Sequence, residues 1–261
     1  LTERLPPNSN FFQASISADD DVFATTVKKA PSWNVTGYLV YRRSTKAILY
    51  KSTDDNNEVK IDKSGRYLYV NTNDQGAGKI EGIVIDTETG KRTNLTDDAP
   101  GHAPSHYDVG TNLIVGNSNY LPGITARRMS DPTHFVSIFK TSILPNYGGF
   151  HLSLLADDES RVLVGFYGPH TSGIMQNELV LIDTTGSQQV WRLLHHHVVF
   201  NSYGDTPRAN ISRDGRFVAF TSNWGKANGR RDLFVARLNR ASIESAPQRP
   251  RRATASRKNF S

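Results

Sequence analysis

Cysteine is the first absence in this sequence, since none of its 261 residues is one. Disulfides, thiol nucleophiles and cysteine-ligated zinc are therefore excluded. Long apolar runs are also missing, and no stretch approaches the roughly 20 residues that a membrane-spanning helix needs. No Gly-x-Ser-x-Gly motif occurs, so the signature of an α/β-type serine hydrolase is lacking. We expect no membrane-spanning segment.

Signatures for nucleotides and calcium are incomplete. Gly76-Ala77-Gly78 lacks the third glycine and the following helix of a dinucleotide-binding fingerprint. Neither Asp97-Asp98 nor Asp19-Asp20-Asp21 has the spacing of a known calcium loop, and we interpret the latter as a turn.

Positive charge is unevenly distributed. The net charge is +6, but six basic residues and one acidic residue lie in 239–261, which leaves the first 238 residues at +1. The tail also contains Pro247 and Pro250. We expect a solvated, disordered tail; the alternative is an anchor for nucleic acid or anionic membrane. Nucleic acid is expected only through this tail.

Internal repeats are present, and they predict the fold. The clearest copy covers 209–238, where an alternating strand, an Asp-Gly turn, a second alternating strand, a polar loop and a third strand follow one another. A similar frame begins at Val59, and its third and fourth strands fall at 82–86 and 92–96. Weaker copies begin near Ala14, His106 and His151.

The turn positions of the five copies are spaced by 45, 45, 48 and 57 residues, counted from Asp20, Gly65, Gly110, Asp158 and Gly215. Four short antiparallel strands at this period are typical of a propeller blade. We predict an all-β fold, a β-propeller of four-stranded antiparallel blades. The expected blades are 9–53, 54–100, 101–145, 146–196 and 203–238, followed by the tail at 239–261.

Both ends of the repeat array look unfinished, because 1–5 resembles the outer strand of a neighbouring blade. We expect a fragment of a larger ring, for example one of seven blades. The alternative is that the N-terminal stretch completes the last blade and closes a five-bladed ring.

The block from Ser212 to Ser222 closely resembles the WD-like repeat of the TolB-type propellers. This resemblance implies a periplasmic or secreted protein. The family contains protein-binding scaffolds, peptidase propeller domains and some polysaccharide lyases, so it implies a fold and no single chemistry.

Histidines gather on one face of the predicted propeller. Loops between blades, and loops between the second and third strands of a blade, open on the same side. This rule places there His102, His106, Asn117, Asn119, Tyr120, His151, Tyr167, His170, His195, His196, His197, Tyr203, Asp205, Arg208, Asn223 and Trp224. Seven of the eight histidines are included, and only His134 is left out. Any one of these histidines could instead bond a neighbouring carbonyl, so it is their grouping on one face that indicates a functional site.

Two functions fit this face. The first is a module that binds a protein or glycan, with aromatic side chains stacking on the partner. Its predicted binding residues are His106, Tyr120, Tyr167, His170, Asp205, Asn223 and Trp224.

The second function is a metal-dependent lyase that cleaves uronate-containing oligosaccharides by β-elimination. Oligogalacturonate lyases hold manganese with histidines and a glutamine, and this chain is distantly similar in having His151 and His195, His196 and His197 at comparable strand entries. The resemblance implies these four as ligands of a divalent metal, manganese or calcium, with Tyr203 or Arg208 as the base. Tyr203 is chemically easier, because a guanidinium hardly loses its proton. A third possibility is a propeller that serves a catalytic domain outside this sequence.

Overall fold

The structure is a computed structural model, which describes residues 7–74, 78–96, 103–118, 121–144, 148–168, 175–239 and 243. Within them, strands pair antiparallel in chain order into four sheets of four strands and one of three. The first two sheets contain β1 (Ser9–Ile16), β2 (Val22–Lys29), β3 (Asn34–Arg42), β4 (Ala47–Ser52), β5 (Glu58–Ile61), β6 (Tyr67–Asn71), β7 (Ile80–Asp86) and β8 (Arg92–Thr96).

The other three sheets contain β9 (Pro104–Val109), β10 (Leu113–Ser118), β11 (Gly123–Arg128), β12 (Asp131–Lys140), β13 (Gly149–Ser153), β14 (Arg161–Tyr167), β15 (Glu178–Asp183), β16 (Val190–His195), β17 (Asn210–Ile211), β18 (Phe217–Ser222) and β19 (Asp232–Arg237). Two short 3₁₀ segments, η2 (Thr141–Ile143) and η3 (Tyr203–Asp205), lie between strands. Residues 1–5 and most of the tail lie outside the described residues.

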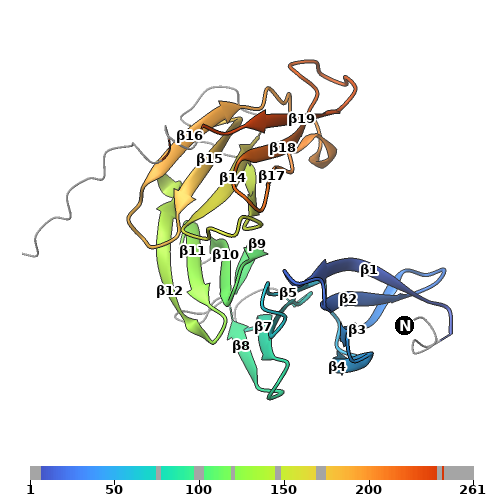
Figure 1. Cartoon of the computed structure of the whole chain (residues 1–261). Helices are drawn as coiled ribbons and strands as arrows, with labels where there is room; N and C mark the ends of the chain where they lie inside the picture. Colours follow the sequence, from blue (N-terminus) through green and yellow to red (C-terminus); the bar gives the residue numbers. More distant parts are fainter. Residues whose placement is uncertain are drawn as a thin grey trace, which may run out of the picture.

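The five sheets follow one another around an arc, and an opening separates the outer parts of the first and last sheets (Figure 1). Contacts between the inner strands β1, β5, β9, β13 and β17 link each sheet to the next. The predicted all-β propeller is confirmed, and each sheet is one blade.

Apolar side chains fill the space between adjacent blades. Val22 and Val40 of blade 1 pack against Ile61 and Leu68 of blade 2, and similar clusters lie between every later pair of blades. Middle strands such as β6 and β15 are buried on both faces, so they are apolar at consecutive positions. Burying one such side chain contributes about 1.5–3 kcal/mol. The blades thereby form a rigid frame for the polar centre.

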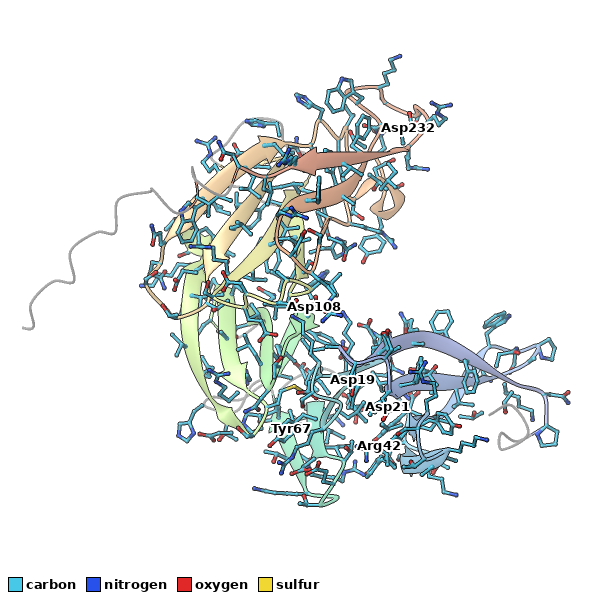
Figure 2. The ribbon with its side chains drawn as sticks, in the orientation of Figure 1. Asp19, Asp21, Arg42, Tyr67, Asp108 and Asp232 are labelled. Atoms are coloured by element: carbon cyan, nitrogen blue, oxygen red, sulfur yellow. The ribbon has the colours of Figure 1, made fainter. Side chains whose placement is uncertain are left out.

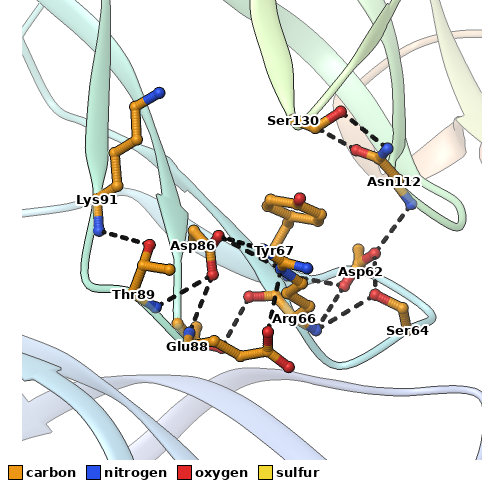
Figure 3. Close-up of polar contacts among 11 residues, drawn as sticks. Asp62, Ser64, Arg66, Tyr67, Asp86, Glu88, Thr89, Lys91, Asn112 and Ser130 are labelled. Carbon is orange, nitrogen blue, oxygen red and sulfur yellow. Dashed lines mark hydrogen bonds and ion pairs between the residues drawn. The ribbon is translucent and has the colours of Figure 1, made fainter.

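The repeated turn is built as the sequence predicts. Asp20, Gly65 and Gly215 occupy the same turn position with φ of +58°, +74° and +66°. In blade 2, the fully buried Asp62 carboxylate accepts hydrogen bonds from the Ser64 hydroxyl and from backbone N–H groups of its own turn (Figure 3). It also accepts one from the backbone N–H of Asn112 in blade 3. This carboxylate therefore fixes a turn and joins two blades.

The turns between the first and second strands of the blades are connected at one end of the centre. The backbone of Lys63 bonds both Ala18 and Gly110, at 2.9 and 3.0 Å, and Asp157 donates to the carbonyl of Arg213 at 2.8 Å. The Arg213 guanidinium then reaches the carbonyl of Ala18 at 3.1 Å, which connects blade 5 to blade 1. A side chain bridges the first and last blades at this end.

No helix among the described residues is long and apolar enough to cross a membrane.

Candidate functional site

A cavity of about 530 Å³, here termed the central cavity, opens between the inner strands. Four residues predicted for the functional face line it together, His106, His151, Tyr203 and Arg208. They come from blades 3, 4 and 5. Two other cavities, of about 300 and 630 Å³, contain none of the predicted site residues.

His151 on β13 has a largely apolar and aromatic surrounding. Its Nε2 lies 3.0 Å from the hydroxyl oxygen of Tyr203, and its ring stacks on Tyr167 with centroids 5.1 Å apart. Nδ1 is buried and has no hydrogen-bond partner among the described residues. Burial, assisted by the nearby His106 and Arg208, lowers the pKa of His151 to about 4. The imidazole is therefore neutral at pH 7.

His106 on β9 lies beside this ring. The centroids of the two imidazole rings are 5.7 Å apart. The ring of Phe150 also packs against His106, with the ring centroids 6.3 Å apart. Partial burial lowers the pKa of His106, against the opposing effect of a hydrogen bond with the backbone of Phe150. The central cavity thus presents two neutral imidazoles, which can both donate and accept hydrogen bonds.

Tyr203 and Arg208 form the blade 5 side of the cavity. The Arg208 guanidinium carbon lies 5.2 Å from the Tyr203 ring centroid, and its Nε donates to the Thr206 hydroxyl at 3.3 Å. Tyr203 is 56% exposed, so one ring face remains accessible. No carboxylate of the described residues forms an ion pair with Arg208. Lys60 on β5, by contrast, forms one with Asp108.

Lys60 and its acidic neighbours were not predicted as site residues. The Lys60 ammonium lies 3.2 Å from Asp108 and 3.9 Å from Glu58, and Lys60 and Glu58 line the cavity. Asp108 lies near the centre of the arc (Figure 2), where it also accepts from the backbone of Leu154 at 2.7 Å. Burial would lower the pKa of Lys60, but these two carboxylates outweigh it and the pKa is raised. The alternation of charged and apolar residues along β5 was the available sequence signal for Glu58 and Lys60.

Asp205 is buried and stabilises the short segment that carries Tyr203. One carboxylate oxygen accepts from the backbone N–H groups of Asn201 and Ser202, and the other accepts from Arg231 at 2.7 Å. Burial would raise the pKa of Asp205, yet these hydrogen bonds outweigh it and the pKa is lowered. Because Asp205 ends η3, it holds the segment that carries Tyr203.

His195, His196 and His197 occupy three different environments, and none lines the central cavity. His196 is fully buried: Nε2 lies 2.8 Å from the carbonyl of Phe166, and Nδ1 accepts from the backbone of Val198. Burial lowers its pKa to about 4. His195 lies 3.3 Å from the Glu178 carboxylate. His197 has a φ of +55° and packs on Trp224 at 4.5 Å.

The remaining predicted binding residues have mixed roles. Asn223 is buried and exchanges two 2.8 Å hydrogen bonds with the backbone of Val199. Trp224 is 53% exposed and stacks on Phe234. Burial raises the pKa of Tyr167 to about 12, and its ring lies between His151 and Phe200. Of these three described residues, only Trp224 has an accessible surface outside the cavity. His102, Asn119, Tyr120 and His170 lie outside the described residues.

The predicted metal ligands do not converge on one point. Within the described ranges, no group of three or more histidine or acidic side chains is placed to share a metal ion. Only His151 of the four histidines reaches the central cavity, and both ring nitrogens of His196 are already engaged. These four side chains therefore do not fit a single metal site in this arrangement.

Solved structures share this architecture. An oligogalacturonate lyase in complex with manganese matches with a TM-score of 0.64 and 10% identity, over 92% of this chain and 68% of its own. An oligogalacturonate lyase from Vibrio parahaemolyticus matches with a TM-score of 0.63, 10% identity, and coverage of 91% and 68%. The fold is that of these propellers.

TolB from Acinetobacter baumannii has the same fold, with a TM-score of 0.54 at 11% identity, over 89% of this chain and 53% of TolB. The predicted resemblance to TolB-type propellers is confirmed at the level of the fold. No protein-family model matches the chain, and no curated protein does. At these identities the likeness shows architecture alone.

Proposed function

We propose that this chain is a binding module whose central cavity takes up an acidic glycan. The observation that carries the proposal is the convergence of His106, His151, Tyr203 and Arg208, from three blades, on one cavity. Arg208 supplies a positive charge that no carboxylate of the described residues neutralises. A ligand that brings a carboxylate is the natural complement.

The chemistry of the wall suits a sugar. A guanidinium binds a carboxylate through two parallel hydrogen bonds, and the exposed ring of Tyr203 offers a face for stacking. The neutral imidazoles of His106 and His151 can bond hydroxyl groups as donor or acceptor. An acidic protein segment is the competing ligand. A periplasmic or secreted location remains part of this proposal, supported by the TolB-type resemblance of the last repeat.

A second candidate is a lyase that acts on uronate-containing oligosaccharides, and the hydrogen bond between His151 and Tyr203 favours it. A neutral His151 can donate an Nε2–H hydrogen bond to the Tyr203 oxygen and so stabilise its phenolate form. The phenolate oxygen then removes the proton next to a carboxylate held by Arg208, the electron pair forms the new C=C bond, and the C–O bond to the leaving sugar breaks. The leaving sugar oxygen takes up the proton that Tyr203 has acquired. The fold likeness to oligogalacturonate lyases supports this candidate, and manganese or calcium remains its proposed cofactor with ligands unassigned.

Calorimetry with trigalacturonic acid, and with a neutral galactose trimer as the control, tests the binding function. We expect the acidic trimer to bind, the neutral trimer to bind weakly, and Arg208→Gln to remove the preference. New ultraviolet absorbance from an unsaturated product, measured with and without manganese, would support the lyase. Absence of binding by the acidic trimer would contradict the glycan proposal, and binding of an acidic peptide instead would favour a protein ligand.

A further inference from the structure

Three inner strands carry the same irregularity. On β1, Phe12 pairs with Thr26 and Ser15 with Ala24, so Gln13 and Ala14 lie opposite a single residue of β2. This is a β-bulge, in which one extra residue bends the strand and redirects a side chain.

Blade 3 repeats it. On β9, Ser105 pairs with Asn117 and Asp108 with Val115, so His106 and Tyr107 lie opposite the single residue Gly116.

Blade 5 repeats it again. Asn210 pairs with Ala219, and the backbone N–H of Thr221 bonds the carbonyl of Pro207 at 2.8 Å. Arg208 and the residue after it therefore lie opposite a single residue of β18. The inner strands of blades 2 and 4 pair without a shift in register.

The first residue of each bulge has a left-handed backbone. Its φ is +52° at Gln13, +42° at His106 and +42° at Arg208, and none of the three is glycine. Each precedes the last residue of its inner strand by three positions, and all three line the central cavity. Residues other than glycine adopt this backbone conformation at an energetic cost, and such strained residues cluster at ligand sites.

Crowding at Gly116 shows how tightly one bulge is packed. A Cβ at this position would lie 2.6 Å from the Pro104 Cβ and 2.9 Å from the Tyr107 Cβ. In blade 3, a side chain at position 116 would therefore force Pro104 or Tyr107 to shift. The bulge of β9 therefore lies opposite a position where β10 has no side chain.

We propose that Gln13, His106 and Arg208 form one recognition triad, aimed by three equivalent bulges at a single ligand in the central cavity. This inference rests on the proposed function and adds Gln13 as a determinant of specificity. The Arg208 guanidinium takes the carboxylate, while the Gln13 amide and the His106 imidazole bond hydroxyl groups. Blades 1, 3 and 5 thus contribute one equivalent side chain each.

Replacement by glycine tests the triad, because glycine adopts positive φ without strain and removes only the side chain. The variants are Gln13→Gly, His106→Gly and Arg208→Gly, and the probe is trigalacturonic acid in calorimetry. Gln188→Gly is the matched control, since Gln188 also has a positive φ, of +61°, but lies in the hairpin between β15 and β16. Melting temperatures check that each variant folds.

We expect each triad variant to lose at least fivefold in affinity while folding, and the control to bind like the wild type. Normal binding by Gln13→Gly together with weak binding by Arg208→Gly would overturn the triad and leave the proposed function intact. A wild type that does not bind the trimer would overturn the proposed function and the triad's ligand together. If Gln13→Gly melts far below the control, the side chain holds the bulge itself, and the recognition role is overturned.

Discussion

The hydroxyl oxygen of Tyr203 lies 3.0 Å from Nε2 of His151, although 52 residues separate them. Tyr203 belongs to η3, outside the strands, whereas His151 is part of β13. The contact therefore joins a loop segment to the rigid frame. Through this contact, a ligand that binds Tyr203 also affects the half-buried imidazole of His151, and the reverse holds as well.

Tyr203→Phe should weaken binding of trigalacturonic acid about fivefold, because the variant loses one hydrogen bond of about 1 kcal/mol that positions the ring. Stacking on the sugar should survive, so a larger loss is expected for Tyr203→Ala. Tyr41→Phe on β3 is the control and should bind normally. Calorimetry measures all three, and unchanged affinity in Tyr203→Phe would show that the contact does not position the ring.

Stability should decline in mild acid because of His196. Its pKa is about 4 in the folded chain, below the ordinary value near 6.5, so the unfolded chain binds this proton first. The contribution of His196 to the free energy of unfolding is fully present above pH 6.5 and is lost as the pH falls toward 4. The loss for this group is at most about 3 kcal/mol. His151 changes stability in the same direction, since its folded pKa is also about 4.

Urea unfolding at several pH values between 7.5 and 4.5 measures this decline. His134→Gln is the control, because His134 is an exposed residue on β12 and its removal should leave the slope unchanged. An equal slope in His196→Asn and the wild type would contradict the assignment to His196.

His196→Ala should destabilise the chain by about 2–4 kcal/mol, because it leaves the carbonyl of Phe166 and the N–H of Val198 without their partners in the interior. His197→Ala removes a packing contact with Trp224 and should cost less than about 1 kcal/mol. Chemical denaturation separates the two. If both variants instead keep full stability and lose bound manganese, a metal role for this histidine cluster is favoured.

Asp205→Asn should lower stability by about 2 kcal/mol, because the charged hydrogen bond from Arg231 is lost. Since Asp205 also fixes η3, affinity for the trimer should fall although Asp205 does not line the cavity. A double-mutant cycle with Arg231→Gln gives the coupling of the pair. Full affinity in Asp205→Asn would show that Tyr203 is held by other contacts.

The repeat could be predicted because its turn chemistry is local. Asp20, Gly65 and Gly215 mark the same left-handed turn position, and a short stretch of sequence suffices to recognise it. His106, His151, Tyr203 and Arg208 line one cavity, and the order of strands and loops in the sequence had grouped them together.

The interior roles could not be predicted in the same way. His195, His196 and His197 are adjacent in sequence, but β16 ends at His195, so each of the three points into a different environment. Alternation along a strand also fails at a bulge, where one extra residue changes which side chain faces the centre. Gln13 was missed for this reason, although its spacing to Ile16 equals that of His106 to Val109.

Gly116, on the second strand of blade 3, influences the shape of the central cavity although it lies behind the residues that line it. It bonds no ligand in the proposed site, yet any larger residue there would push Pro104 or Tyr107, which lie on the same strand as His106. Heritable changes in sugar preference could therefore arise at a position that a survey of ligand contacts would pass over. Homologous chains with a larger residue at this position should have a displaced β9 and, with it, a different orientation of the residue at position 106.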